Sequence, residues 1–210
     1  MNEIIKDFSN ARQVSFDAVI TGWLGAGGLG SFYPDIGFSK PVPDTVKARY
    51  DQFVSYGDLF LRFIPHCDWF EVRFDATWFS KVRLIDESSW KHESSGGERL
   101  LAKRTDLTTL PQEHLDRINQ LRLRKNLGDL LDRKAVLFGH SPSDEWSILD
   151  GNHRLLALAC QHLIDKCPLD EFSIFVGFSF GPCRWHGDPV VWQERPERTA
   201  GERRYVLKTW

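Results

Sequence analysis

The sequence predicts an α+β fold in which a mixed β-sheet packs against helices. Short apolar runs at 134–140, 146–150 and 172–180 are bounded by turn residues, as is typical of buried strands. Residues 151–165 instead repeat apolar side chains at the helical spacing of three and four. With 41% hydrophobic and 27% charged residues in 210, the chain has the composition of a globular protein whose core needs no disulfide or metal.

The first seventy residues differ from the rest because they are rich in Gly, Pro and aromatic residues. We expect an irregular, aromatic-rich extension there, with a short strand at 18–21 and a helix that Asp44 caps. The predicted units are an N-terminal extension over 1–70 that packs on the core, a catalytic core over 71–180 and a C-terminal tail over 181–210.

The core is expected to open with strands, because Val72 and Phe74 alternate with Arg73, and Val82 and Leu84 alternate with charged neighbours. The next element is a helix whose first turn holds Pro111 and which Gly128 interrupts. Strands at 134–140 and 146–150 follow, joined by a turn at 141–145, and then a helix at 151–165. A central strand is expected at 172–180, with candidate edge strands at 190–192 and 205–207.

Charge and targeting signals restrict the function classes. The net charge of −2 gives no global field toward nucleic acid, although the basic stretch at 117–134 is either a DNA-steering surface or a solvated one. The N-terminus lacks a signal-peptide pattern, and no apolar run approaches the ~20 residues that span a bilayer. We therefore expect a cytoplasmic protein without membrane insertion.

The run at 150–154 carries the clearest chemistry. A strand delivers Asp150, and Gly151 allows a tight turn, so the helix beginning at Asn152 or His153 exposes free amides that attract anions. Arg154 adds a donor fork for phosphate, and His153 adds a donor or a proton carrier near neutral pH. Asp150 is expected either to hold Mg²⁺ or to fix the histidine. The structural alternative is an ordinary turn in which the asparagine caps the helix.

The segment LDGNHRLLALA resembles the signature of the ParB/sulfiredoxin superfamily, and the order of elements over 82–178 agrees with it. The resemblance implies that fold, binding of ATP or another nucleotide through Gly151, Asn152, His153 and Arg154, and Mg²⁺ on Asp150. Asn152 stands where sulfiredoxins place a reactive cysteine, so sulfinic-acid reduction is not expected. The plasmid fertility-inhibition and oncogenic-suppression proteins, associated with ATP and DNA hydrolysis, are the most similar branch.

The resulting hypothesis is a nucleotide-binding phosphohydrolase, an ATPase and/or DNase, that inhibits conjugative DNA transfer. Its partners would be a nucleotide, DNA and a protein of the conjugation or secretion machinery. The predicted catalytic residues are Asp150, His153, Arg154 and Glu98. Glu98 lies on a Gly-rich loop, with Asp86 at a strand end as an equal candidate for the carboxylate that orients the nucleophile. The alternatives are a non-catalytic interaction protein that blocks the transfer machinery and a small-molecule kinase.

Three further features receive other interpretations. His140 follows a strand and could lie beside the signature histidine if the two strands are neighbours, but a structural hydrogen bond is the favoured role. Cys183, His186 and Asp188 match no closed zinc pattern, so a zinc site is rejected. The glycine-rich run at 25–30 lacks the Lys-Ser/Thr of a phosphate loop and is predicted to be a flexible turn.

Overall fold

The structure is a computed structural model, and part of the chain is described in it. The predicted helix after Asp44, the run at 25–30, the interruption at Gly128, and Cys183 and Asp188 lie outside the described residues. The described residues are 11–24, 67–86, 90, 98–104, 106–123, 134–179, 186, 192–194 and 205–207.

The described elements form an α+β fold with a six-stranded mixed sheet, so the predicted fold class is confirmed at this level. The strand order is β1-β2-β6-β4-β5-β3. β7 and β8 pair with each other as a separate antiparallel ribbon. In chain order the elements are β1 (Arg12–Gln13), α1 (Phe16–Leu24), β2 (Asp68–Phe74), the 3₁₀ helix η6 (Ala76–Ser80), β3 (Val82–Arg83), α3 (Gln112–Arg122), β4 (Val136–Gly139), β5 (Trp146–Asp150), α5 (Asn152–Leu163), β6 (Phe172–Phe178), β7 (Trp192–Glu194) and β8 (Tyr205–Leu207).

Strand direction decides which loops meet at each end of the sheet. β3 runs parallel to β5, with Arg83 opposite Ser147, so the residues after β3 and the residues after β5 emerge at the same edge. β4 runs antiparallel to β5, with Val136 opposite Asp150. His140, which follows β4, therefore lies at the other end of the strand pair from the start of α5. The prediction that it neighbours the signature histidine is wrong for this reason.

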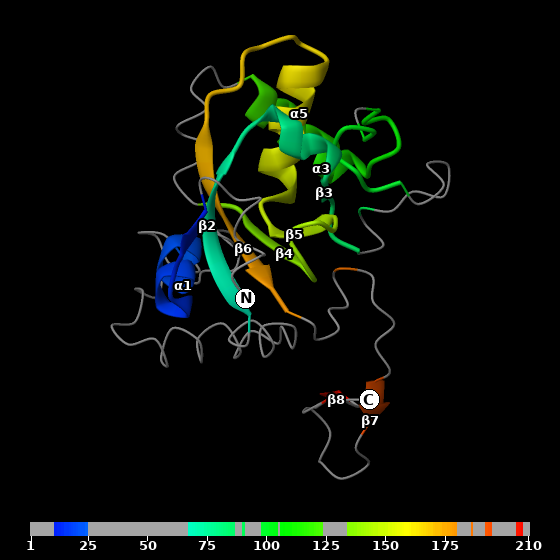
Figure 1. The fold of residues 1–210 in the computed structure, drawn as a ribbon. Coiled ribbons are helices and arrows are strands. Elements are labelled where there is room, and N and C mark those ends of the chain that lie inside the picture. The colour runs from blue at the N-terminus through cyan, green and yellow to red at the C-terminus, as the bar shows by residue number, and fades with distance from the viewer. Residues whose placement is uncertain are drawn as a thin grey trace.

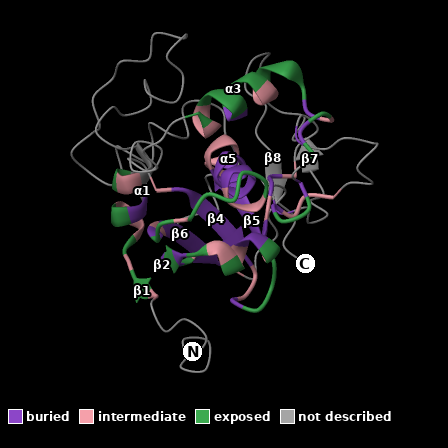
Figure 2. Ribbon diagram, turned by 90° about the horizontal axis from the view of Figure 1, so that it is seen from above, coloured by how far each residue is buried: buried purple, intermediate pink, exposed green. Residues whose placement is uncertain are grey.

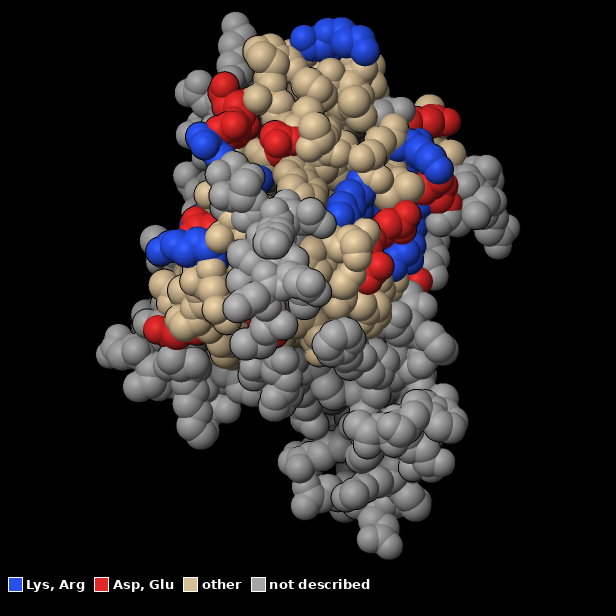
Figure 3. Space-filling model, viewed as in Figure 1, with Lys and Arg blue, Asp and Glu red and all other residues tan. Residues whose placement is uncertain are grey.

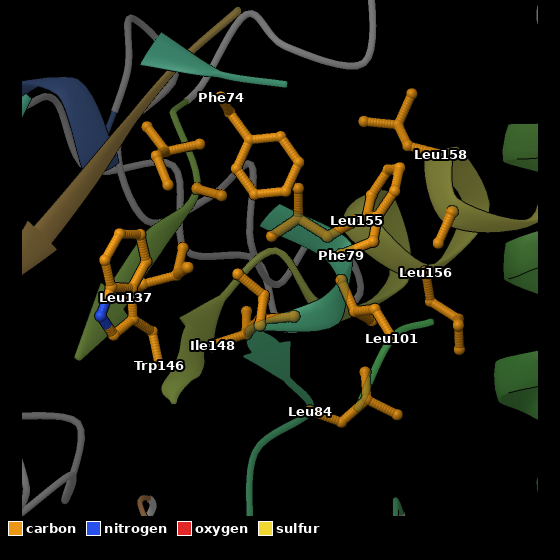
Figure 4. Packing of buried hydrophobic residues seen from close by; sticks show 14 of the residues in the cluster. Phe74, Phe79, Leu84, Leu101, Leu137, Trp146, Ile148, Leu155, Leu156 and Leu158 are labelled. Carbon is orange, nitrogen blue, oxygen red and sulfur yellow. The ribbon is translucent and has the colours of Figure 1, made fainter. Parts of the chain in front are cut away.

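The main core lies between the sheet and α5. Along β6, Phe172, Ile174, Val176 and Phe178 all belong to this core, as the two-residue period of a strand requires. Figure 4 shows leucines of α5 packed beside aromatic rings and strand residues of the same core. Viewed from above, α5 lies over the sheet and is buried along most of its length, whereas α3 lies outside it with a largely exposed surface (Figure 2).

The opposite face of the sheet is covered in part by α1, which lies beside β2 in Figure 1, away from α3 and α5. A Cβ on Gly22 would lie 2.6 Å from the ring of Phe175, so α1 approaches β6 closely at this glycine. The strand predicted at 18–21 is wrong. Ser15 starts a helix instead, because its Oγ accepts a hydrogen bond from the amide of Ala18, and Val19 is buried.

Two other boundaries differ from the prediction. β2 begins at Asp68 and pairs along its whole length with β6, so the boundary expected after residue 70 falls inside a strand. β1 adds to the outer edge of β2, which makes part of the predicted extension a strand of the main sheet. The strand over 172–180 is central as predicted, because β6 lies between β2 and β4. None of the helices in the described part of the chain combines the length and apolar character that crossing a bilayer requires.

Candidate functional site

Gly151 makes the turn between β5 and α5. It is the N-cap of α5 with φ 101° and ψ 16°, a left-handed conformation that favours glycine. Its carbonyl accepts the first helical bond, from the amide of Leu155 at 2.9 Å. Glycine has no side-chain oxygen to cap the helix, so the amides of the first turn receive no bond from their own N-cap side chain. The predicted strand–turn–helix geometry is confirmed.

Asn152 has a structural contact. Its side chain is buried, and its Oδ1 accepts a hydrogen bond of 3.0 Å from the amide of Ile85. Ile85 follows β3, so this bond ties the segment after the edge strand to the start of α5. The predicted role of Asn152 in nucleotide binding is untested, but its amide oxygen is engaged by the protein itself.

Arg154 folds back over the turn. Its guanidinium donates to Oδ2 of Asp150 at 2.8 Å, and the two side chains are 19% and 21% exposed, so solvent reaches both. The same guanidinium lies 3.2 Å from where a Cβ on Gly151 would stand. Because Gly151 has no Cβ, the ion pair between Arg154 and Asp150 has room to form beside it. Asp150 is thus one residue that competes with any bound anion for Arg154.

His153 is held by α3. Its Nε2 lies 2.8 Å from Nδ1 of His114, and one of the two rings must donate the shared proton. Trp90 stacks on His114 with ring centroids 4.2 Å apart, and meets His153 edge-on at 4.8 Å. Two imidazoles and an indole thus form one cluster beside the first turn of α5.

The surroundings of His153 distinguish between its two predicted roles, a hydrogen-bond donor and a proton carrier. Burial, followed by the charges of Arg117, His114 and Arg154, lowers the pKa of His153 from 6.5 to about 3. Protonation would place a cation in a partly buried site beside two guanidinium groups. The lowered pKa does not favour a proton carrier near neutral pH, and the other predicted role, a hydrogen-bond donor, stays a prediction. His153 is neutral there, and Arg117 and Arg154 supply the positive charge of the site.

Glu98 has local contacts. Its Oε1 accepts bonds from the amides of Arg99 and Leu100, and Oε2 pairs with Lys103 at 3.2 Å. The backbone bond from Leu100 is the largest factor that lowers the pKa of this carboxyl, so it stays ionised. A carboxylate stabilised by three donors is a weak base, and these contacts do not favour the predicted catalytic role.

The described residues do not form a resident metal site. They contain no group of three or more His, Cys, Asp or Glu side chains that could hold a metal ion. Asp150, the expected Mg²⁺ ligand, is paired with Arg154, whose charge would repel a dication. Asp86, the other candidate carboxylate, lies 3.6 Å from Arg99. A metal held by the protein alone does not fit these residues.

The basic stretch is only partly described. Arg122 pairs with Asp165 at 2.8 Å, and Lys134 pairs with Glu71, so both cations are compensated locally. On the face drawn in Figure 3, acidic and basic side chains of the described residues are interspersed. The described part of this face therefore lacks the single-sign field that DNA binding favours.

Sequence reasoning missed Trp90 and His114, and it placed Arg117 only in the basic stretch at 117–134. The helical spacing could have placed His114 on the inner face of α3, because it precedes the buried Ile118 by four residues. Nothing local connects Trp90 to this site. It reaches the imidazoles only because α3 packs on α5, across sequence separations of 24 and 63 residues.

The chain was compared with protein-family models, with curated proteins and with solved structures, and none of the three comparisons finds a match.

Proposed function

We propose that the chain binds the phosphate groups of a nucleotide at the start of α5 and hydrolyses them, as a phosphohydrolase of the ParB/sulfiredoxin type. The supporting observation is the left-handed Gly151, which turns β5 into α5 and leaves the first-turn amides without a side-chain cap. Arg154 lies over that turn, and the charge of Arg117 acts on the neighbouring His153. Uncapped helix amides beside two arginines are an arrangement that attracts phosphate.

In this proposal Arg154 exchanges Asp150 for a phosphate oxygen. The neutral ring of His153 donates a hydrogen bond to the phosphate, with His114 fixing its tautomer. Magnesium enters as part of the nucleotide substrate, since this ion is usually held by substrate phosphates and few protein carboxylates. The residue that activates water is not assigned, and Glu98 and Asp86 stay candidates. Inhibition of conjugative transfer in the cytoplasm, with DNA and a transfer-machinery protein as partners, is the biological role proposed with it.

The test separates binding from turnover. Binding of ATP and of inorganic pyrophosphate is measured by thermal shift, where a ligand at a hundred times its dissociation constant adds ~2.7 kcal/mol to stability. Hydrolysis of ATP and of DNA is measured with Mg²⁺. We expect Arg154→Ala to abolish both binding and hydrolysis while circular dichroism stays unchanged. Asp150→Asn should bind pyrophosphate more tightly, because it removes the competing carboxylate. Equal binding by wild type and Arg154→Ala contradicts the proposal.

Two exposed apolar side chains favour the interaction protein as the second candidate. Leu123 is 82% exposed and Ile164 is 45% exposed, at the C-terminal ends of the packed helices α3 and α5. The Arg122–Asp165 pair holds these two ends together. An adaptor would show no stabilisation by any nucleotide, and Leu123→Glu would remove its effect on conjugation while leaving its fold intact.

A further inference from the structure

His186 is a described residue of the C-terminal tail that is buried against the sheet face opposite α5. Ser147 lies between the core residues Trp146 and Ile148 on β5, so its side chain points to that opposite face. The Oγ of Ser147 lies 3.1 Å from Nδ1 of His186, and both residues are buried. The rings of Phe138 and His140 meet the imidazole edge to face, at 5.6 and 4.8 Å.

Two arginines converge on the backbone of the same residue. The carbonyl oxygen of His186 accepts bonds of 2.6 Å from Arg83 and 3.1 Å from Arg99. Arg83 also donates to Oγ of Ser147, which joins the carbonyl and imidazole contacts into one network. These four residues, His186 with Ser147, Arg83 and Arg99, are called the His186 anchor below.

Arg99 connects this anchor to the edge of the sheet. Its guanidinium donates to the carbonyl of Leu84 at 3.3 Å and lies 3.6 Å from the carboxylate of Asp86. Its backbone carbonyl accepts the amide of Leu84 at 2.8 Å. Both the backbone and the side chain of Arg99 thus hold residues 84–86. Burial is the main cause that lowers the pKa of Arg99 to about 10, so the group keeps its charge at neutral pH.

Residues 84–86 in turn support the start of α5, because Ile85 donates its amide to Oδ1 of Asn152. An unbroken series of contacts therefore runs from His186 through Arg99 and the segment 84–86 to Asn152. This series of contacts begins on the sheet face that His186 contacts. It passes around the edge strand β3 and ends at the turn before α5, which lies on the other face.

We propose that His186 and Arg99 are positioning residues: they fix the segment 84–86 against Asn152, and phosphate affinity at the start of α5 depends on this anchor. The phosphate part rests on the proposed function. His186 then supports a site on the far side of the sheet through these intervening residues. A guanidinium is suited to this role because its planar fork reaches several acceptors from one side chain.

The experiment uses full-length protein with His186→Ala, His186→Asn and Arg99→Met. Asparagine keeps a polar group near the position of Nδ1 and tests rescue. His162→Ala is the matched control, since its ring also makes a hydrogen bond through Nδ1, here to the backbone carbonyl of Cys167. The first measurement is hydrogen exchange and chemical shift of the Ile85 amide, without ligand. The second is the dissociation constant for inorganic pyrophosphate.

We expect the Ile85 amide to exchange roughly tenfold faster in His186→Ala and Arg99→Met. The pyrophosphate dissociation constant should rise about fivefold in both, a coupling of ordinary size. His186→Asn should fall between these variants and wild type, and His162→Ala should match wild type. Unchanged Ile85 exchange in both folded variants overturns the anchor. If wild type binds no pyrophosphate, the proposed function fails, and the anchor is judged on the Ile85 amide alone.

Discussion

Replacing Gly151 by alanine tests whether the turn before α5 requires a glycine. The φ of 101° costs an L-residue about 1–2 kcal/mol. The new Cβ would lie 3.0 Å from Cβ of Ala135, which is buried just before β4, and 3.2 Å from the guanidinium of Arg154. Relieving such overpacking costs a further ~1–3 kcal/mol. Gly151→Ala should therefore lower the free energy of unfolding by about 2–5 kcal/mol.

The assay is urea unfolding followed by tryptophan fluorescence and circular dichroism. With a slope of ~2 kcal/mol per molar urea, the midpoint should fall by at least ~1 M. Gly151→Asn is the control, because it carries the same Cβ but adopts positive φ more readily. It should be more stable than Gly151→Ala. Reasoning from backbone conformation is refuted if alanine leaves the midpoint unchanged or is better tolerated than asparagine.

Two further predictions concern the residues that follow this glycine. The pKa of His153 is about 3 in the folded protein and about 6.5 in the unfolded chain. The unfolded chain therefore binds more protons, and the free energy of unfolding falls as the pH drops below 6.5. His153→Gln should remove up to about 2 kcal/mol of the loss between pH 6.5 and 5, and identical pH profiles of unfolding for the two proteins would contradict the buried neutral ring. Asn152→Ala should cost about 1–3 kcal/mol in urea unfolding because it leaves the buried amide of Ile85 without its acceptor, and a wild-type midpoint would show that this bond contributes nothing.

Much of the fold on the C-terminal side could be predicted because local patterns there agree with the tertiary structure. β4, β5 and β6 are short apolar runs, and α5 combines a glycine turn with helical periodicity. At 18–21 the local pattern was ambiguous, since four residues cannot separate the period of a strand from that of a helix. The helix forms because Ser15 caps it and because Gly22 lets it approach Phe175.

The candidate site also has one part that the sequence predicts and another that it does not. The turn at Gly151 is a local feature and follows from residue type. The residues that contact this turn do not follow from residue type, because these contacts depend on packing between distant segments. His114 meets His153 only where α3 lies on α5. Burial, followed by the charges of Arg117, His114 and Arg154, lowers the pKa of His153 and keeps it neutral. The contact between Ile85 and Asn152 likewise depends on the parallel pairing of β3 with β5.

The most direct test of phosphate binding at the start of α5 is a titration of ¹⁵N-labelled protein with inorganic pyrophosphate, followed by amide chemical shifts. The backbone amides of Asn152, His153 and Arg154 should shift together and saturate in wild type, and should not respond in Arg154→Ala. Saturating shifts confined to other regions, or amides at 152–154 that respond equally in both proteins, would contradict the account.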